Sequence, residues 1–500
     1  MTTWLDVATH FARTRDLDEE VIAVLRCFAG PEPRGGPPPP PEEPWDDSFE
    51  ALERELLAVD LAAIAGRLMG EVDHGQAELF ARRVQSVDAA IAALHDDVGR
   101  LLRVGLRHRL RTVTRGRTAR ATRTRALADF YYSVAGLHRS RRLGGEHLVM
   151  EQHVSRLRWR RVSDGVEHAQ LEGRSDLGPL HVNLLRIEPE HVHLRVLDCR
   201  ESVERGEPFH ALVSAHGAIA GVSGGFFLYS EPDIAPPSRR FDPVGLLMDE
   251  GEVLGPPVFA RGAVLVHDDG TVAIDRVSMS QVEIEAPSGA RWRPSAVVNR
   301  AHARRGPDRP GAAVVGHEVV AVGRSLPVPL NGFVLEPPPG VELRPGDRLR
   351  YPVVHGPAGR PLRTGIAGGP LLLQDGEPTL DMRAEDLWGS APPVTFSQDE
   401  TGDHNLLPRL AAGLTDEGQL LLAAVDGRNL EHALGMTLGG VARLLRALGC
   451  HRATNLDGGS SKRMVVEGRT CDLATTEIVA EGVASTLVRP VHTGLLVLPR

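Results

Sequence analysis

The sequence predicts an α+β protein, in which a mostly β C-terminal domain with one strand-helix-strand unit follows an α-helical N-terminal region. Before about residue 150, apolar residues recur at alternating spacings of four and three, which is the pattern of packed helices. After it, short apolar runs broken by Gly, Pro and Asp indicate strands. A single amphipathic helix pattern separates two of these runs, which favours α+β over a doubly wound sheet.

Size and composition place the chain among globular proteins. It has 500 residues, of which 42% are hydrophobic and 25% charged, and its net charge is -9. The length favours two or three domains, and the mild acidity gives no global reason to expect nucleic acid. We expect a short helix with a Pro-rich linker over residues 1–45, a helical hairpin or bundle over 46–150 and an α+β domain over 151–500.

The N-terminal region is expected to be helical on both sides of a linker. Residues 4–28 have the pattern of a short amphipathic helix, and residues 31–44, PEPRGGPPPPPEEP, form an extended polyproline spacer. The apolar residues from Phe80 to Leu101 predict a long helix, and we expect residues 49–72 to pack on it.

A basic stretch from Arg103 to Arg125 carries nine arginines and no acidic residue. Such a helix could bind the phosphates of a polyanion weakly, and the chain could then be a helical adaptor. Alternatively, it is a solvated face that the acidic N-terminal segment partly neutralises. Aromatic stacking residues are missing until Phe130, which favours the second interpretation.

Cysteine spacing and hydropathy exclude some classes of protein. Because Cys27, Cys199, Cys450 and Cys471 form no CxxC pair, we expect neither a structural zinc site nor a disulfide framework. The start of the chain lacks an apolar signal core, and no apolar run reaches the roughly 18 residues of a membrane helix. We therefore expect a cytoplasmic protein with no membrane span, of undetermined oligomeric state.

The β part contains one convincing helix, which Thr437 can cap and Gly449 ends. It is predicted over residues 437–448. Apolar runs typical of strands surround it and extend upstream, at residues 191–196, 262–266, 312–322, 369–373 and 419–425.

Chemistry is expected where two strands end. One ends in Asp426-Gly427-Arg428, and the other in Asp457-Gly458-Gly459-Ser460-Ser461. If the helical crossover makes these strands neighbours, both aspartates emerge at one edge of the sheet. The Gly-rich turn offers N–H groups to an anion, and the arginine fork suits a phosphate, so a phosphorylated or polyhydroxylated substrate is indicated. Each motif taken alone is equally typical of an ordinary turn.

The sequence from Gly217 to Leu498 resembles the phosphodiester glycosidases, the family of the lysosomal enzyme that uncovers mannose 6-phosphate by removing N-acetylglucosamine. The resemblance is strongest in the ordered run VDGR (425–428), GMTL (435–438) and NLDGGSS (455–461). Weaker matches are Gly224-Gly225-Phe226-Phe227, Gly368-Gly369-Pro370 with Leu372, Pro408-Arg409 with Gly413, and Arg489.

The resemblance implies hydrolysis of the bond between a sugar's anomeric carbon and a phosphodiester oxygen, with a glycosyl phosphodiester or glycan as substrate. Asp457 and Asp426 are expected to be the nucleophile or general base and its partner. Arg428 and Arg409 would hold the departing phosphate, and Asn455 would orient Asp457. The remaining expected substrate-binding residues are Gly458, Gly459, Ser460, Ser461, Gly225 and Phe226.

Neither a metal nor another cofactor is expected, because no spacing of carboxylates and imidazoles resembles a metal cage. His216 and His404 lie near matched segments and could shuttle protons, but surface or packing roles are favoured.

Some positions depart from the family pattern. Ser223 stands where the family usually has Asn, and Leu410 where it usually has Thr. Ser460 replaces a third Gly, and Lys462 and Arg463 replace small hydroxylic residues. These changes leave open an altered sugar, a weakened activity or a glycan- or sugar-phosphate-binding protein without catalysis. If Lys462 and Arg463 face the cleft, they favour a more anionic ligand.

Overall fold

The fold is taken from a computed structural model. It describes residues 4–17, 46–64, 81, 85, 88–89, 92, 96–113, 150–175, 178–228, 234–382, 384–387, 406–429, 432–478 and 484–500. The predicted linker over 31–44, most of the apolar seam from Phe80, and His404 lie outside these residues.

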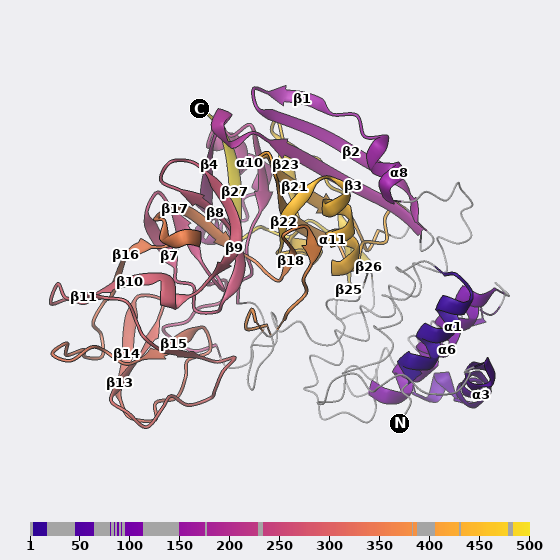
Figure 1. Cartoon of the computed structure of the whole chain (residues 1–500), viewed down its shortest axis with the longest axis horizontal. Helices are drawn as coiled ribbons and strands as arrows, with labels where there is room; N and C mark the ends of the chain where they lie inside the picture. The colour runs from indigo at the N-terminus through magenta and orange to yellow at the C-terminus, as the bar shows by residue number, and fades with distance from the viewer. Residues whose placement is uncertain are drawn as a thin grey trace.

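Three N-terminal helices, α1 (Trp4–Thr14), α3 (Asp46–Leu57) and α6 (Asp97–Val113), lie together to one side of a large β body (Figure 1). Phe11 of α1 stacks on Phe49 of α3 with ring centroids 3.9 Å apart. Within the described residues, the helix predicted over 4–28 forms as far as Thr14, and α3 packs on α6. The packing expected between residues 49–72 and the helix from Phe80 to Leu101 stays a prediction, because most of that helix lies outside the described residues. No helix in the described ranges is long and apolar enough to cross a membrane.

Two arginines at the start of the basic stretch bind an acidic residue within the same helical region. Arg107 Nη2 lies 2.6 Å from Oδ2 of Asp88, and Arg103 Nε lies 3.2 Å from its Oδ1. These contacts neutralise part of the basic stretch through Asp88, which lies within the predicted apolar seam, so neutralisation by the acidic N-terminal segment stays a prediction. Docking on a polyanion stays a prediction, because residues 114–125 lie outside the described part of the chain.

The central sheet has eight strands in the order β1-β2-β3-β21-β20-β22-β18-β19. Helices α11 (Leu438–Ala447) and α8 (Met150–Ser155) cover one face of it, where they bury a core that includes Leu444 and Ala423. The strands are β1 (Arg160–Ser163), β2 (Val166–Ser175), β3 (Gly178–Ile187), β21 (Leu420–Val425), β20 (Arg409–Thr415), β22 (Cys450–Leu456), β18 (Leu371–Gln374) and β19 (Glu377–Pro378).

Two five-stranded sheets enclose the core on the opposite face of the central sheet. The first has β24 (Arg469–Thr470), β23 (Met464–Val466), β5 (Ala220–Ser223), β27 (Thr493–Pro499) and β4 (Val192–Asp198) in that order. Its outer face is covered by α10 (Phe209–Ala215), which follows the short α9 (Arg200–Glu204). The second has β7 (Glu252–Gly255), β6 (Leu247–Asp249), β17 (Leu362–Ala367), β8 (Arg261–His267) and β9 (Val272–Val277).

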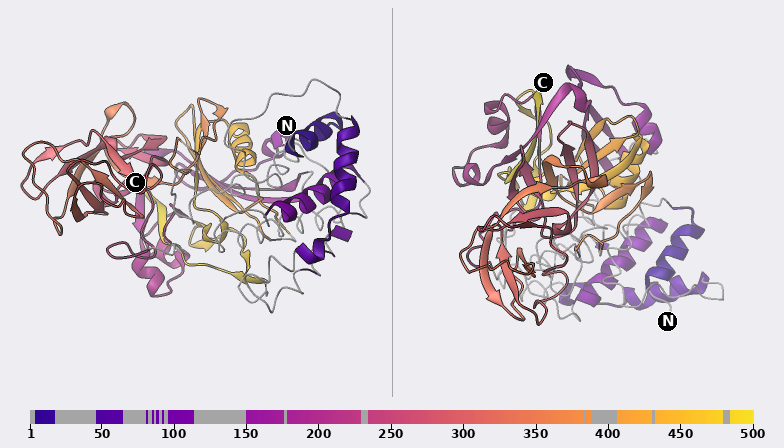
Figure 2. Two further views of the ribbon diagram at one scale, coloured as in Figure 1. Left: turned by 90° about the horizontal axis from the view of Figure 1, so that it is seen from below. Right: turned by 60° about the vertical axis from the view of Figure 1, so that its left-hand side comes forward.

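Two smaller sheets extend from the β body at the end opposite the N-terminal helices (Figure 2). They share a core around Phe259, Phe333 and Tyr351 with parts of the second five-stranded sheet. Their strands are β10 (Val282–Glu285), β11 (Arg291–Trp292), β12 (Val297–Asn299), β13 (Gly311–Val315), β14 (Glu318–Gly323), β15 (Gly332–Leu335) and β16 (Arg350–Val354). A separate hairpin pairs β25 (Thr475–Ile478) with β26 (Ala484–Leu487).

The α+β class is confirmed, and so is the helix predicted over residues 437–448. Thr437 Oγ1 accepts a hydrogen bond from the N–H of Gly440 at 2.9 Å, and Gly449 ends the helix at a φ of 88°. The single strand predicted over 312–322 is wrong, because it is a hairpin that turns at Gly316 with a φ of 57°. Helices α9 and α10 were not predicted, since both are too short for a clear period.

Candidate active site

The two aspartate turns emerge at one edge of the central sheet, as expected, but their strands are not neighbours. Strand β20 lies between β21 and β22 and pairs antiparallel with both, so β21 and β22 are parallel to each other. Asp426 and Asp457 each follow the last residue of one of these strands. Two strand spacings of about 4.8 Å therefore separate the strand ends, and Arg409 begins β20 between them.

The turn after β22 is held tightly against the start of β20. The N–H of Gly459 donates to the carbonyl of Pro408 at 2.9 Å. A Cβ on Gly458 would lie only 2.6 Å from the same carbonyl oxygen, so this approach requires a glycine. Ser460 and Ser461 follow in a 3-10 turn, Gly459–Ser461, and are buried.

Asp457 is half-buried, and its backbone N–H donates to the carbonyl of Gly224 at 2.9 Å. This bond joins β22 of the central sheet to the segment after β5 of the facing sheet. Asn455 is buried, and its Nδ2 donates to the carbonyl of Gly369 at 3.0 Å. This contact of the Asn455 amide orients the Gly-Gly-Pro segment, and an orienting role toward Asp457 stays a prediction.

Asp426 lies in the interior, with none of its side chain exposed. Its Oδ1 accepts a hydrogen bond from the N–H of Leu473 at 3.0 Å and another from Nζ of Lys462. Its Oδ2 lies 2.5 Å from Nδ1 of His181 on β3. Both oxygens are therefore engaged by protein groups, which is the arrangement of a carboxylate that acts on other side chains rather than directly on a substrate.

Lys462 and Arg463 do not face solvent but complete this buried charge cluster. Lys462 Nζ and Arg463 Nη1 each lie 3.3 Å from Oδ2 of Asp472. Burial lowers the pKa of Lys462 to about 8, and Asp472 opposes that shift. Two basic groups thus balance Asp426 and Asp472 inside the protein, so the expectation of a more anionic ligand has no support from these residues.

Two of the departures from the family pattern are also buried. Ser223 ends β5, and its Oγ accepts a hydrogen bond from the N–H of Arg463 at 2.9 Å. Leu410 packs in the core between the sheets. The serine therefore fixes the segment that carries Lys462 and Arg463.

The Gly-Gly-Phe-Phe segment after β5 is positioned by β27. The N–H of Gly225 donates to Oγ1 of Thr493 at 2.9 Å. Phe226 is half-buried against the core of the smaller sheets, and Phe227 packs against His492 in a tilted arrangement with ring centroids 3.7 Å apart. These contacts make the two phenylalanines part of the core, and a sugar contact by Phe226 stays a prediction.

The two arginines differ in exposure. Arg409 is buried, and its Nε donates to the carbonyl of Met436 at 3.1 Å. Arg428 is half-buried and has a left-handed backbone with a φ of 50° in the turn after β21. Arg428 is therefore the less buried of the two arginines.

Sequence reasoning missed His181, which contacts Asp426. Its signal was weak, namely polar residues at His181 and Asn183 alternating with apolar ones in β3. His216 follows the end of α10 and is exposed, and its Nδ1 lies 2.8 Å from the carbonyl of Leu212, which agrees with a surface role. Cys199 and Cys450 are buried thiols whose pKa burial raises to about 12.

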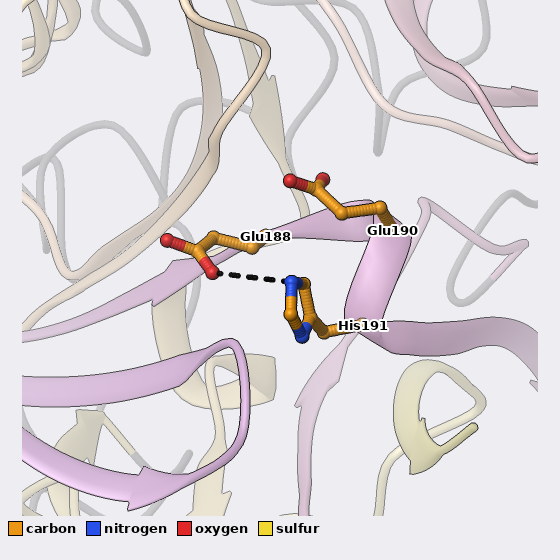
Figure 3. A group of neighbouring side chains, drawn as sticks. All are labelled: Glu188, Glu190 and His191. Atoms are coloured by element: carbon orange, nitrogen blue, oxygen red, sulfur yellow. Dashed lines mark ion pairs between the residues drawn. The ribbon is translucent and has the colours of Figure 1, made fainter.

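A group of metal-ligand type occurs at the turn between β3 and β4 (Figure 3). The ligand atoms of Glu188, Glu190 and His191 lie within 4.8 Å of one another, near the protein surface. His191 already pairs with Asp164 at 3.0 Å, and this contact raises the pKa of its imidazole. The cluster is accounted for by surface ion pairs, and catalysis without a metal stays a prediction.

A carboxylate, a guanidinium and a Gly-rich turn at one sheet edge form a set suited to a sugar phosphate. Residues 336–498 match the phosphodiester glycosidase family, which confirms the resemblance of this part of the chain to that family. No curated protein matches the chain.

Three solved structures are similar to the chain. A hypothetical protein from Synechocystis is 20% identical, with a TM-score of 0.44 over 69% of this chain and 64% of that one. A protein from Burkholderia pseudomallei described as exported is 23% identical, with a TM-score of 0.43 over 65% and 75%. The catalytic domain of zebrafish N-acetylglucosamine-1-phosphodiester alpha-N-acetylglucosaminidase, described as auto-inhibited by its pro-peptide, is 15% identical, with a TM-score of 0.41 over 68% and 85%.

Proposed function

We propose that the chain hydrolyses the bond between the anomeric carbon of a sugar and an oxygen of a phosphodiester. The products are a free sugar and a phosphomonoester. The observation that carries this proposal is the match of residues 336–498 to the phosphodiester glycosidase family, which includes both turns after β21 and β22. The sugar that the resemblance implies is N-acetylglucosamine.

The chemistry requires few groups. Phosphate is already a good leaving group, so stabilising the oxocarbenium-like centre and delivering water matter more than protonating the departing oxygen. Asp457 is the half-buried carboxylate of the pair and therefore our candidate for the nucleophile or general base. Asp426 has no exposed side-chain surface, so its proposed part as partner is indirect.

The other proposed roles follow the positions of the residues along the sheet edge. Arg428 and Arg409 flank the end of β21 and would bind the phosphate oxygens. The Gly458 and Gly459 amides with the hydroxyls of Ser460 and Ser461 would bind sugar hydroxyls or phosphate oxygens. Asn455, Gly225 and Phe226 complete the proposed substrate-binding set.

The experiment that tests the proposal is hydrolysis of a synthetic N-acetylglucosamine 1-phosphodiester in water labelled with heavy oxygen. We expect free sugar and phosphomonoester in equal amounts. The heavy oxygen should appear in the anomeric hydroxyl of the sugar, because the bond between the anomeric carbon and the phosphodiester oxygen breaks. Label on the phosphate would show phosphorus–oxygen cleavage and contradict a glycosidase. No release from a panel of different sugars would also contradict it.

One observation favours a second candidate, a sugar-phosphate-binding protein without turnover. Both carboxylate oxygens of Asp426 bind protein groups in the interior. Of the two aspartates, only Asp457 is then placed to act on a substrate. Calorimetry with a sugar 1-phosphate distinguishes the two functions, because tight binding without any hydrolysis of the corresponding diester would favour the binding protein.

A further inference from the structure

His181 and Asp426 form a pair at the edge of the central sheet. His181 lies near the start of β3, the strand next to β21, and its carbonyl accepts a hydrogen bond from the N–H of Asp426 at 2.9 Å. Its Nδ1 lies 2.5 Å from Oδ2 of Asp426. The imidazole is 11% exposed, whereas the carboxylate is fully buried. A buried carboxylate therefore lies directly behind a partly exposed imidazole.

The surroundings of Asp426 fix its ionised form. Its Oδ1 accepts from the N–H of Leu473 and from Nζ of Lys462, and such donors stabilise a carboxylate. Because an ionised carboxylate can only accept hydrogen bonds, the proton of the His181 pair belongs to Nδ1. In the neutral ring, the free lone pair is then on Nε2, on the side away from Asp426.

The Nε2 atom of His181 lies toward the protein surface. It is 3.5 Å from Oε1 of Glu172, whose side chain is 72% exposed on the neighbouring strand β2. Burial lowers the pKa of His181 below its ordinary value, and the charge of Lys462 acts in the same direction, while Glu172 and Asp472 raise it. In its neutral form the imidazole can accept a proton at Nε2.

We propose that His181 is an acid–base residue of the candidate site and that Asp426 and Lys462 are positioning residues behind it. Nε2 takes a proton from water or from a substrate hydroxyl, and the imidazolium that forms is stabilised by the ionised Asp426. The same proton then leaves from Nε2 to an oxygen of the product or to bulk water, which restores the neutral ring. Only the identity of the group that exchanges the proton rests on the proposed function.

Site-resolved acylation tests the pair without any need for activity. Diethyl pyrocarbonate acylates unprotonated imidazole nitrogens, and peptide mass spectrometry reports each histidine. We expect His181 to react in the wild type, and Asp426→Asn to lower its rate at least tenfold. The Asn amide can donate to Nδ1, which moves the ring proton to Nε2 and removes the outward lone pair. The exposed His193 and His210 serve as internal references whose rates stay unchanged. Equal rates at His181 in the two proteins would overturn the proposal.

A surface variant covers the case in which Asp426→Asn does not fold. Glu172→Gln changes an exposed side chain and removes a carboxylate that raises the pKa of His181. We expect the pH midpoint of His181 acylation to fall in this variant. An unchanged midpoint would mean that Nε2 does not face Glu172, and would overturn the proposal.

Sugar release separates this inference from the proposed function. If the wild type releases sugar and His181→Gln keeps the same rate and pH profile, the acid–base role is wrong and the hydrolase stands. If the wild type releases nothing while acylation behaves as expected, the hydrolase is wrong and the acid–base pair stands.

Discussion

At the scale of single residues, burial decides which charged groups can act on a substrate. The two aspartates follow strands in the same way in the sequence, yet Asp457 is half-buried and Asp426 is enclosed by Lys462, His181 and Leu473. The sequence predicted that both would lie at one edge. It could not predict their different surroundings, because the residues around Asp426 come from segments far apart in the chain.

Replacing Lys462 tests the buried charge cluster. Lys462→Met would leave Asp426 and Asp472 with less positive charge in the interior, and breaking such a buried pair costs about 3–5 kcal/mol of unfolding free energy. Urea denaturation measures this loss. Arg446→Met is the control, since the Arg446 side chain is 53% exposed and its pair with Glu377 is expected to contribute at most about 1 kcal/mol. Equal losses in the two variants would contradict the buried cluster.

His492 is expected to make stability depend on pH. It is buried between Phe227 and Phe241, and burial lowers its pKa to about 4, with Arg489 and Arg240 acting in the same direction. The unfolded chain therefore binds the proton more readily between pH 6.5 and 4. The unfolding free energy should fall as the pH is lowered through this range, by up to about 1.4 kcal/mol per pH unit.

Urea denaturation at several pH values checks this prediction. His492→Phe should flatten the dependence between pH 6.5 and 4, because the group that takes up the proton on unfolding is gone. His193→Gln, at an exposed position, should keep the wild-type slope. If His492→Phe leaves the pH dependence of the unfolding free energy unchanged, groups other than His492 cause it.

At the scale of elements, the helix between the two turns was predicted well because its signals are local. Its cap residue Thr437, its apolar face and its end at Gly449 lie within one short stretch of sequence. The order of the strands is not local. Strand β20 comes before β21 in the chain but lies between β21 and β22, and nothing in the spacing of apolar residues reports that placement.

The helix cap offers a prediction at this scale. Thr437→Ala removes the side-chain oxygen that accepts from the N–H of Gly440 and should cost about 1 kcal/mol of unfolding free energy. Thr437→Ser keeps that oxygen and should cost clearly less. Thermal or urea denaturation compares them, and equal stability of the two variants would contradict a stabilising cap.

The turn after β22 leads to a second prediction at the scale of elements. Gly458→Ala would place its Cβ 2.6 Å from the Pro408 carbonyl oxygen, so the turn must shift away from β20. Gly459 has open space around its Cβ position but a φ of 59°, so Gly459→Ala costs only backbone strain, about 1 kcal/mol. We expect Gly458→Ala to reduce sugar release more than Gly459→Ala does. A larger loss of sugar release in Gly459→Ala than in Gly458→Ala would mean that the contact with Pro408 is unimportant for the site.

At the scale of the whole molecule, the division into N-terminal helices and a β body could be read from the change of apolar spacing near residue 150. The packing of several sheets within that body could not, because the sequence shows strands but not which faces meet. The same limit applies to the site, which joins segments after β5, β21 and β22 with the start of β20. Motif order predicted the resemblance to the family, and only the fold brings these segments together.

The central claim is that this sheet edge hydrolyses glycosyl phosphodiesters with Asp457 as its accessible carboxylate. The most direct measurement is the rate of N-acetylglucosamine release from a 1-phosphodiester by the wild type, Asp457→Asn and the control Asp416→Asn, whose exposed aspartate lies at the opposite end of β21. We predict that Asp457→Asn loses at least about 100-fold in rate, with unchanged thermal stability, and that Asp416→Asn keeps the wild-type rate. Full activity in Asp457→Asn, or no release by any of the three proteins, would contradict the claim.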